Sequence, residues 1–69
     1  MNTRLLITCR IPRYASYLLE EGFTIEELHA HRNAKLLDFD TDQNNGKGVY
    51  EISLLGLKML GESVPMFEV

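Results

Sequence analysis

The pattern of hydrophobic and polar residues is clearest between positions 37 and 53, where it has the two-residue period of β-strands. Leu37–Thr41 alternates larger side chains with aspartates, which predicts a strand with one half-buried face and one acidic face. Val49–Ser53 is rich in β-forming residues and predicts the partner strand. The segment between them contains Asn45-Gly46, a dipeptide that is frequent in tight hairpin turns. The pattern therefore predicts a β-hairpin.

A short helix is predicted directly after the hairpin. Ser53 can cap its first turn, Leu54–Leu60 is almost wholly apolar, and Gly61 suits a helix end. A helix with so few polar positions is expected to be buried. The segment Val64–Val69 follows as a short extended tail, and its proline, Pro65, confines it to the edge of a sheet or to no sheet.

Two helices joined by a tight turn are predicted upstream of the hairpin. The first is expected over Pro12–Glu21, where apolar side chains recur at helical spacing, and Gly22 is placed to end it. The second begins after the capping box Thr24-x-x-Glu27. Phe23 and Leu28 have the spacing of a hydrophobic staple, which would fix the angle of the turn. The apolar stripe of the second helix fades without a clear end signal.

The first ten residues allow two interpretations. The β-branched pair Ile7 and Thr8 favours an extended strand over residues 4–10. The alternative is a first helix capped by Asn2 or Thr3. We expect the strand.

Length and composition indicate one small folded domain spanning residues 1–69. The apolar fraction of 45% is typical of a globular protein and too high for a disordered chain. Cys9 is the single cysteine, so an internal disulfide is excluded, and no cysteine–histidine spacing suits a zinc site. No apolar run approaches the length of a membrane span or a secretion signal, which leads us to expect a cytoplasmic protein.

The chain carries a net charge of −3 and has a pI near 5.2. DNA-binding modules gain much of their affinity from contacts between basic side chains and phosphates. The acidic balance therefore argues against tight non-specific binding to DNA, although it leaves room for a local basic patch.

The order of helix, tight turn, helix, hairpin and short helix resembles the winged-helix family of helix-turn-helix domains over about residues 13–60. Two motifs carry the resemblance: Tyr50-x-Ile52-Ser53-x-x-Gly56-x-x-x-Leu60, where the second wing strand enters the last helix in many members, and the corner Leu18-Leu19-Glu20-Glu21-Gly22-Phe23-Thr24-Ile25-Glu26-Glu27-Leu28. The resemblance implies a small α+β, winged-helix-like domain of two or three helices plus a β-hairpin. It also implies a DNA-binding or transcription-regulatory role.

The chain departs from that family in two respects. A full winged helix usually has three helices before the wing, whereas two are clear in this sequence. Family members also tend to be basic along the recognition helix, and the corresponding segment here, residues 30–37, is sparsely basic.

Candidate DNA contacts are the side chains that can pair with base edges or phosphates. Some lie near the end of the second predicted helix, one lies at the hairpin tip, and two flank the proline at position 12. An ordinary role as a solvated surface residue is the alternative for each of them. The candidates are Arg32, Asn33, Lys35, Lys47, Arg13 and Arg10.

The sequence predicts neither an enzyme nor a metal or cofactor site. It contains no nucleophile–base signature and no glycine-rich phosphate loop. His29 and His31 are two residues apart, so they point to different sides of a helix and do not share a metal ion.

The alternative function is an acidic protein–protein interaction module, such as an inhibitor or accessory protein of a mobile element, that binds no DNA. Asp38, Asp40 and Asp42 share one face of the predicted strand, and the apolar tail Val64–Val69 offers a second contact surface. The small core and exposed strand edges further suggest a homodimer.

Overall fold

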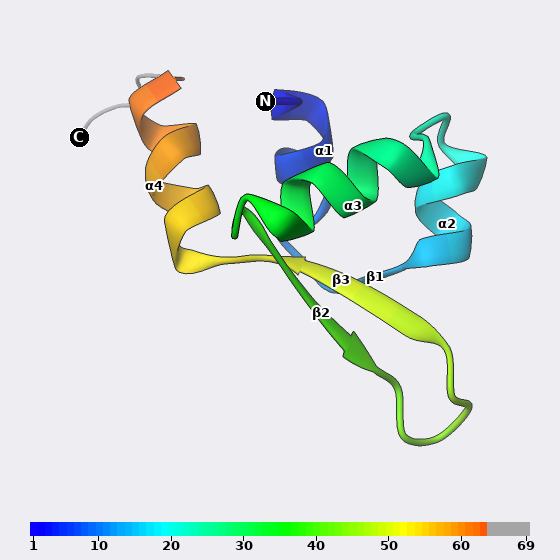
Figure 1. The fold of residues 1–69 in the computed structure, drawn as a ribbon. Coiled ribbons are helices and arrows are strands. Elements are labelled where there is room, and N and C mark those ends of the chain that lie inside the picture. The colour runs from blue at the N-terminus through cyan, green and yellow to red at the C-terminus, as the bar shows by residue number, and fades with distance from the viewer. Residues whose placement is uncertain (64–69) are drawn as a thin grey trace.

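The computed structural model describes residues 1–63, and for residues 62 and 63 it describes the backbone alone. The described chain forms four helices and a three-stranded sheet (Figure 1). The elements in chain order are α1 (Thr3–Thr8), β1 (Arg13–Tyr14), α2 (Ala15–Glu20), α3 (Ile25–Asn33), β2 (Leu37–Thr41), β3 (Gly48–Ile52) and α4 (Leu54–Ser63).

The three strands are antiparallel in the order β1-β3-β2. Tyr50 is opposite both Arg13 and Phe39, so these three side chains belong to one face of the sheet, which we call the inner face. Asp38 is opposite Glu51 on the other face, the outer face. In Figure 1 the β2–β3 hairpin projects beyond the helices. The expected α+β fold class is confirmed, and the layout is compatible with a winged-helix-like fold. The described residues form four helices where two or three were expected.

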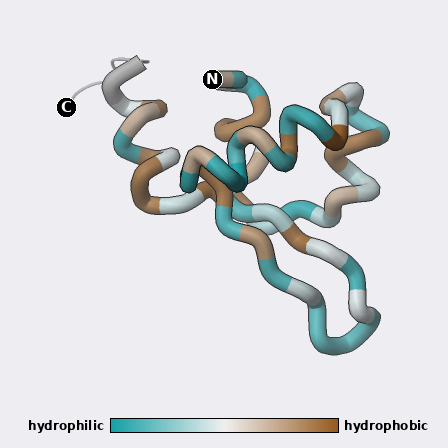
Figure 2. The backbone as a smooth tube through the Cα atoms, viewed as in Figure 1, coloured by the Kyte–Doolittle hydropathy of each residue, from teal (hydrophilic) through white to brown (hydrophobic). Residues whose placement is uncertain are grey.

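The core lies where α1, α2 and α3 meet the inner face of the sheet. Each fully buried leucine contributes about 1.5–3 kcal/mol to folding relative to an exposed one. The tip of the hairpin takes no part in this core, and Figure 2 shows it to be hydrophilic. The buried apolar residues are Leu5, Leu6, Cys9, Leu18, Phe23, Leu28, Leu37, Tyr50, Ile52 and Leu60.

The expected N-terminal strand over residues 4–10 is wrong, because the chain forms helix α1 there. The side chain of Asn2 caps this helix by accepting a hydrogen bond of 3.1 Å from the Leu5 amide. Leu5, Leu6 and Cys9 are all fully buried. A strand would turn Leu5 and Leu6 to opposite faces, whereas a helix buries all three on one side.

The expected helix over Pro12–Glu21 is also wrong in its first part. Arg13 and Tyr14 form strand β1, and Tyr14 has an extended backbone with φ −65° and ψ 145°. Tyr14 is opposite Val49, so this short strand supplies an edge for β3. Pairing with a strand distant in sequence therefore delays the start of α2 to Ala15.

The predicted corner between α2 and α3 is confirmed in detail. Gly22 adopts a left-handed backbone with φ 101°, and the Thr24 hydroxyl accepts a hydrogen bond of 3.1 Å from the Glu27 amide. The Glu27 carboxylate in turn accepts one of 2.9 Å from the Thr24 amide. Phe23 and Leu28, the predicted staple pair, are both buried.

Helix α3 ends in a Schellman turn that the sequence did not indicate. The Leu36 amide donates to the His31 carbonyl at 2.9 Å, and the Lys35 amide donates to the Arg32 carbonyl at 3.0 Å. Lys35 takes the left-handed conformation, with φ 67°, that glycine usually supplies. The turn leads directly into β2.

Ser53 and Gly56, at the junction of β3 and α4, contact this turn directly. The Ser53 hydroxyl donates a hydrogen bond of 2.6 Å to the Lys35 carbonyl and accepts one of 2.9 Å from the Gly56 amide. The Ser53 amide donates to the Leu36 carbonyl at 3.1 Å. A side chain at Gly56 would overlap that same carbonyl oxygen, so the close approach requires glycine.

The expectation that the last helix is buried and ends at Gly61 is wrong. Helix α4 continues to Ser63, and Leu54 is 86% exposed while Leu57 is 44% exposed. Gly56 and Leu60 alone among its described side-chain positions are buried. A ten-residue helix that touches the body along one narrow side has no neighbour to cover its other apolar positions.

The predicted hairpin is confirmed: β2 has the expected bounds, and β3 is shifted by one residue. β3 spans Gly48–Ile52, because Ser53 leaves the sheet to cap α4. The Asp42 amide closes the loop by donating to the Lys47 carbonyl at 2.8 Å, and Gly46 has a positive φ of 73°. The tail Val64–Val69, predicted to be extended, lies outside the described residues.

Candidate nucleic-acid interface

The two faces of the sheet carry side chains of opposite charge. Asp38, Asp40 and Glu51 project from the outer face, because each lies one residue out of phase with the buried positions of its strand. The inner face instead carries Arg13, and Arg32 reaches it from α3. The alternation of the strands therefore separates acidic from basic groups across the thickness of one sheet.

Arginine and aromatic side chains follow one another along the inner face. The Arg32 guanidinium lies 4.4 Å from the centroid of the Phe39 ring, and the Phe39 and Tyr50 ring centroids are 4.9 Å apart in an edge-to-face arrangement. Across the sheet, the Arg13 guanidinium lies 4.8 Å from the centroid of the Tyr17 ring. We call these five residues the arginine–aromatic row.

A glycine on β3 makes room for one ring of the row, and the rings differ in their exposure to solvent. Gly48 lies beside Phe39, and a side chain there would overlap the ring, so glycine leaves the space that the ring occupies. Phe39 and Tyr17 are each more than one-third exposed, whereas Tyr50 is buried. The row is therefore anchored in the core at its centre and open to solvent at both ends.

Arg13 also has a role inside the fold. Its Nε donates a hydrogen bond of 3.1 Å to the Thr8 carbonyl at the end of α1. Arg4, which the sequence did not single out, behaves in the same way: it lies 4.2 Å from the centroid of the Phe23 ring and donates to the Glu21 carbonyl at 3.3 Å. Both arginines thus brace turns between elements.

Apart from Lys47, the remaining predicted DNA contacts lie in two places. Arg32 and Asn33 are exposed in the last turn of α3, and Lys35 is exposed two residues further on. Arg10 is exposed just after α1. The structure thus brings Arg32, Asn33 and Lys35 to one end of α3, with Arg13 on the inner face of the sheet that Arg32 reaches.

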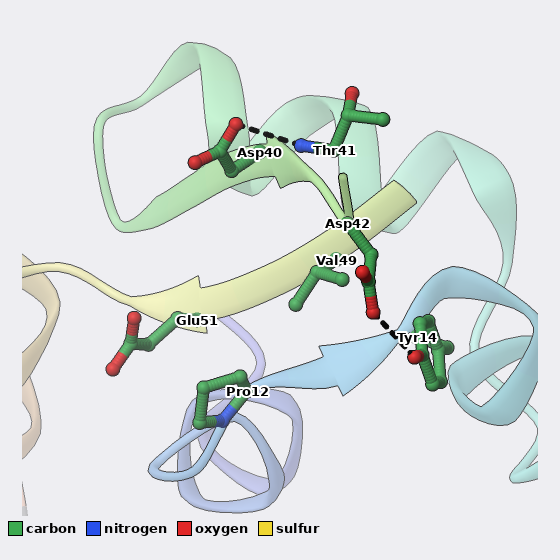
Figure 3. A pocket seen from close by; sticks show the side chains of 7 residues that line it. All are labelled: Pro12, Tyr14, Asp40, Thr41, Asp42, Val49 and Glu51. Carbon is green, nitrogen blue, oxygen red and sulfur yellow. Dashed lines mark hydrogen bonds between the residues drawn. The ribbon is translucent and has the colours of Figure 1, made fainter. Parts of the chain in front are cut away.

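Lys47, the predicted tip contact, is directed toward the outer side of the hairpin. Its ammonium lies 5.8 Å from the centroid of the Tyr14 ring, which belongs to the outer face. The Tyr14 hydroxyl donates a hydrogen bond of 2.7 Å to Asp42, and this bond is the main reason that the pKa of Asp42 lies below its ordinary value. Tyr14 therefore ties β1 to the hairpin loop (Figure 3).

A hollow of about 400 Å³ opens on the outer face, between β1 and the hairpin (Figure 3). Its apolar part is formed by a proline, a valine and a tyrosine, and three carboxylates surround them. Glu51 completes the acidic set, and the sequence alone did not group it with the aspartates. The lining residues are Pro12, Tyr14, Asp40, Thr41, Asp42, Val49 and Glu51.

The two histidines have different environments. His31 is buried, its Nε2 accepts a hydrogen bond of 2.9 Å from the Asn2 amide, and its Nδ1 lies 2.7 Å from the Glu27 carbonyl. This pattern places the imidazole hydrogen on Nδ1 and makes His31 a link between α1 and α3. His29 is exposed on α3.

Cys9 is a free thiol in the core. Burial raises its pKa to about 11, and the nearby Arg13 opposes that rise only in part. A thiol with so high a pKa is a poor nucleophile at neutral pH.

The described residues hold no cluster of three or more potential metal ligands. Within residues 1–63, every helix falls short of the length and apolarity that a membrane span requires.

We found no family model, no curated protein and no solved structure that matches this chain.

Proposed function

We propose that this protein is a small cytoplasmic regulator of winged-helix type that binds duplex DNA through the arginine–aromatic row and the exposed end of α3. The observation that carries the proposal is the separation of charge across the sheet. Arg13 and Arg32 serve the inner face, while Asp38, Asp40 and Glu51 are directed away from it.

This separation removes the objection raised by the net charge of −3. Interactions between exposed charges are screened beyond about 8–10 Å at physiological salt, so phosphates near one face respond mainly to that face. The carboxylates of the outer face then repel DNA from the outer side only. Together the two faces orient the protein on a duplex.

The side chains at the end of α3 are suited to contact both backbone and bases. The Arg32 guanidinium lies over the Phe39 ring, and a guanidinium on an aromatic face can still donate its N–H groups to phosphate or guanine. Asn33 is exposed in the same turn and is the residue type that pairs with adenine. Two or three cations per copy supply a modest affinity that falls with salt.

The proposal is tested by fluorescence anisotropy with mixed duplex fragments at low salt. We expect saturable binding, and we expect Arg32→Ala to weaken it and to lower the slope of log K against log salt by roughly one. Lys47→Ala is the matched control, because it removes the same charge from the outer side of the hairpin, where the ammonium lies near Tyr14. An absence of binding at high protein concentration, or an equal loss in both variants, would refute the proposal.

The outer hollow supports a second candidate function, binding of a basic protein segment. An apolar floor surrounded by Asp40, Asp42 and Glu51 suits an arginine or lysine side chain, whose aliphatic stem and charged head need both kinds of surface. Calorimetric titration with an arginine-rich peptide tests it, and we expect Asp40→Asn combined with Glu51→Gln to weaken binding. Glu20→Gln on α2 is the control. Equal binding by all variants would exclude the hollow.

A further inference from the structure

Aromatic rings with a guanidinium against them recur along the arginine–aromatic row. The Arg32 guanidinium lies 4.4 Å from the centroid of the Phe39 ring, and the Arg13 guanidinium lies 4.8 Å from the centroid of the Tyr17 ring. Contacts of this kind that contribute to stability occur roughly once per 70–80 residues in proteins. Two of them on one surface of so small a domain are therefore more than its size accounts for.

The rings at the two ends of the row are open to solvent. Phe39 is 36% exposed and Tyr17 is 37% exposed, whereas Tyr50, which lies between them, is 2% exposed. Gly48 keeps the space beside the Phe39 ring free of any side chain, because a Cβ there would lie 2.7 Å from the nearest ring carbon. The row thus has a buried centre and a solvent-accessible guanidinium–ring pair at each end.

Contact with a duplex leaves these rings without a partner. In a duplex each base is stacked on its neighbours, so protein contacts go to phosphates and base edges. An unpaired base exposes its planar faces, and these faces stack on aromatic rings or on the planes of arginine guanidinium groups. The row offers both kinds of surface, and its arginines also attract the phosphates of a strand.

The charge of the protein suits the same kind of ligand. A net charge of −3 weakens any interaction that depends on phosphate contacts alone. Stacking of a base on a ring requires no charge, and single strands release fewer counterions per contact than duplexes do. A surface with two arginines and two exposed rings therefore gains more from unpaired bases than from a duplex backbone.

We propose that the arginine–aromatic row binds single-stranded nucleic acid, with one base stacked on each guanidinium–ring pair. The chemistry is shared by DNA and RNA, because every base has a planar face and both kinds of strand carry phosphates. The proposal uses the surface assigned above to duplex DNA, but it goes beyond duplex binding and does not depend on it.

Fluorescence anisotropy of the full chain at low salt tests the proposal with labelled strands of about 15 nucleotides. The strands are oligothymidylate, oligouridylate and a DNA strand that has the same phosphates but no bases. We expect the natural protein to bind oligothymidylate roughly fivefold or more tighter than the abasic strand, which is the gain from stacking one base. The ratio of the thymidylate and uridylate affinities identifies DNA or RNA as the preferred source. Equal affinity for the abasic strand would overturn the proposal, because phosphate contacts would then account for all of the binding.

Tyr17→Leu removes one exposed ring. We expect it to weaken oligothymidylate binding roughly fivefold or more and to change duplex binding by less than about twofold. Tyr14→Leu is the matched control, because it makes the same change at a tyrosine that is 38% exposed on the outer face. It should leave the affinity unchanged, and circular dichroism should show both variants folded.

Two results with these variants would overturn the proposal. One is an equal loss of single-strand affinity in Tyr17→Leu and Tyr14→Leu. The other is an equal loss of single-strand and duplex affinity in Tyr17→Leu, because the ring would then serve only to hold Arg13 in place.

A duplex of about 15 base pairs in the same titration separates this proposal from the proposed duplex binding. Binding to the duplex without binding to either single strand would overturn this proposal and leave the proposed function standing. Binding to a single strand alone would support this proposal and refute duplex binding. An absence of both would refute both.

Discussion

Helix α4 has two sides that differ in how closely they are fitted to the rest of the molecule. On the inward side, Ser53 and Gly56 hold the turn after α3 through hydrogen bonds and a close backbone approach. On the outward side, leucines lie in solvent, and no described side chain lies within 4 Å of a methyl group added at Gly61. Hydrophobicity alone therefore does not determine which side of α4 is buried. The hydrogen bonds of Ser53 and the close approach at Gly56 determine which side packs against the body.

The largest effect is expected where the fit is closest. Gly56→Ala should destabilise the fold by about 3 kcal/mol, because its methyl group would overlap the Leu36 carbonyl oxygen and crowd Ile52. A loss of that size approaches the whole stability of so small a domain. Thermal and urea unfolding monitored by circular dichroism measure it. A change below about 0.5 kcal/mol would show that α4 can shift freely, and that the inward side is not the tight one.

Ser53→Ala tests the hydrogen bonds that Ser53 makes to the turn after α3 and to the first turn of α4. We expect a loss of about 1–2 kcal/mol, since the Gly56 amide loses its cap and the Lys35 carbonyl loses a donor. Ser16→Ala on α2 is the control, because Ser16 is exposed and its replacement should stay within about 0.5 kcal/mol. If both variants lost a similar free energy of unfolding, the hydrogen bonds of Ser53 would contribute no more to stability than an exposed serine does.

Gly61→Ala probes the outward side with the same substitution that is damaging at Gly56. Here alanine should stabilise the protein by about 0.5–1 kcal/mol, because Gly61 is helical, no residue in the described part of the chain lies within 4 Å of the added methyl group, and alanine favours helix. Urea unfolding at low protein concentration, where association contributes least, provides the measurement. A destabilisation instead would indicate that α4 is covered at Gly61.

The smallest effect is expected for the pH dependence of stability that arises from Glu27, at the corner between α2 and α3. The hydrogen bond from the Thr24 amide is the main cause that lowers the pKa of Glu27 below 4.5, followed by the one from Asn2. A lowered pKa contributes stability above about pH 4.5 that is lost as the pH falls through the folded value. Glu27→Gln keeps a capping side chain but cannot titrate, so its stability should fall less steeply between pH 5 and pH 3.

Unfolding free energies measured across that range provide the test. Parallel pH profiles for the natural protein and for Glu27→Gln would contradict the assigned role of the carboxylate.

The candidate interface was only partly predictable from the sequence. The sequence indicates Arg32 and Asn33 because these side chain types pair with base edges, but it gives no partner within the fold for Arg32, such as Phe39. The signal existed: the predicted alternation already put Phe39 on the face opposite the aspartates. The sequence also predicts Lys47 as a wing contact, and only the loop geometry shows that its ammonium lies near the Tyr14 ring.

The features that depend on a few adjacent residues could be predicted without a structure: the capped corner after Gly22, the hairpin around Gly46 and the serine that starts α4. Their hydrogen bonds join residues close in sequence, so the local pattern contains both partners. Three features follow only from the packing of distant segments: the helix over residues 3–8, the pairing of Tyr14 with a strand and the exposure of the leucines of α4. Each of these features depends on whether a distant part of the chain packs against the segment. An apolar residue type indicates that a side chain can be buried, but it does not indicate which segment will cover it.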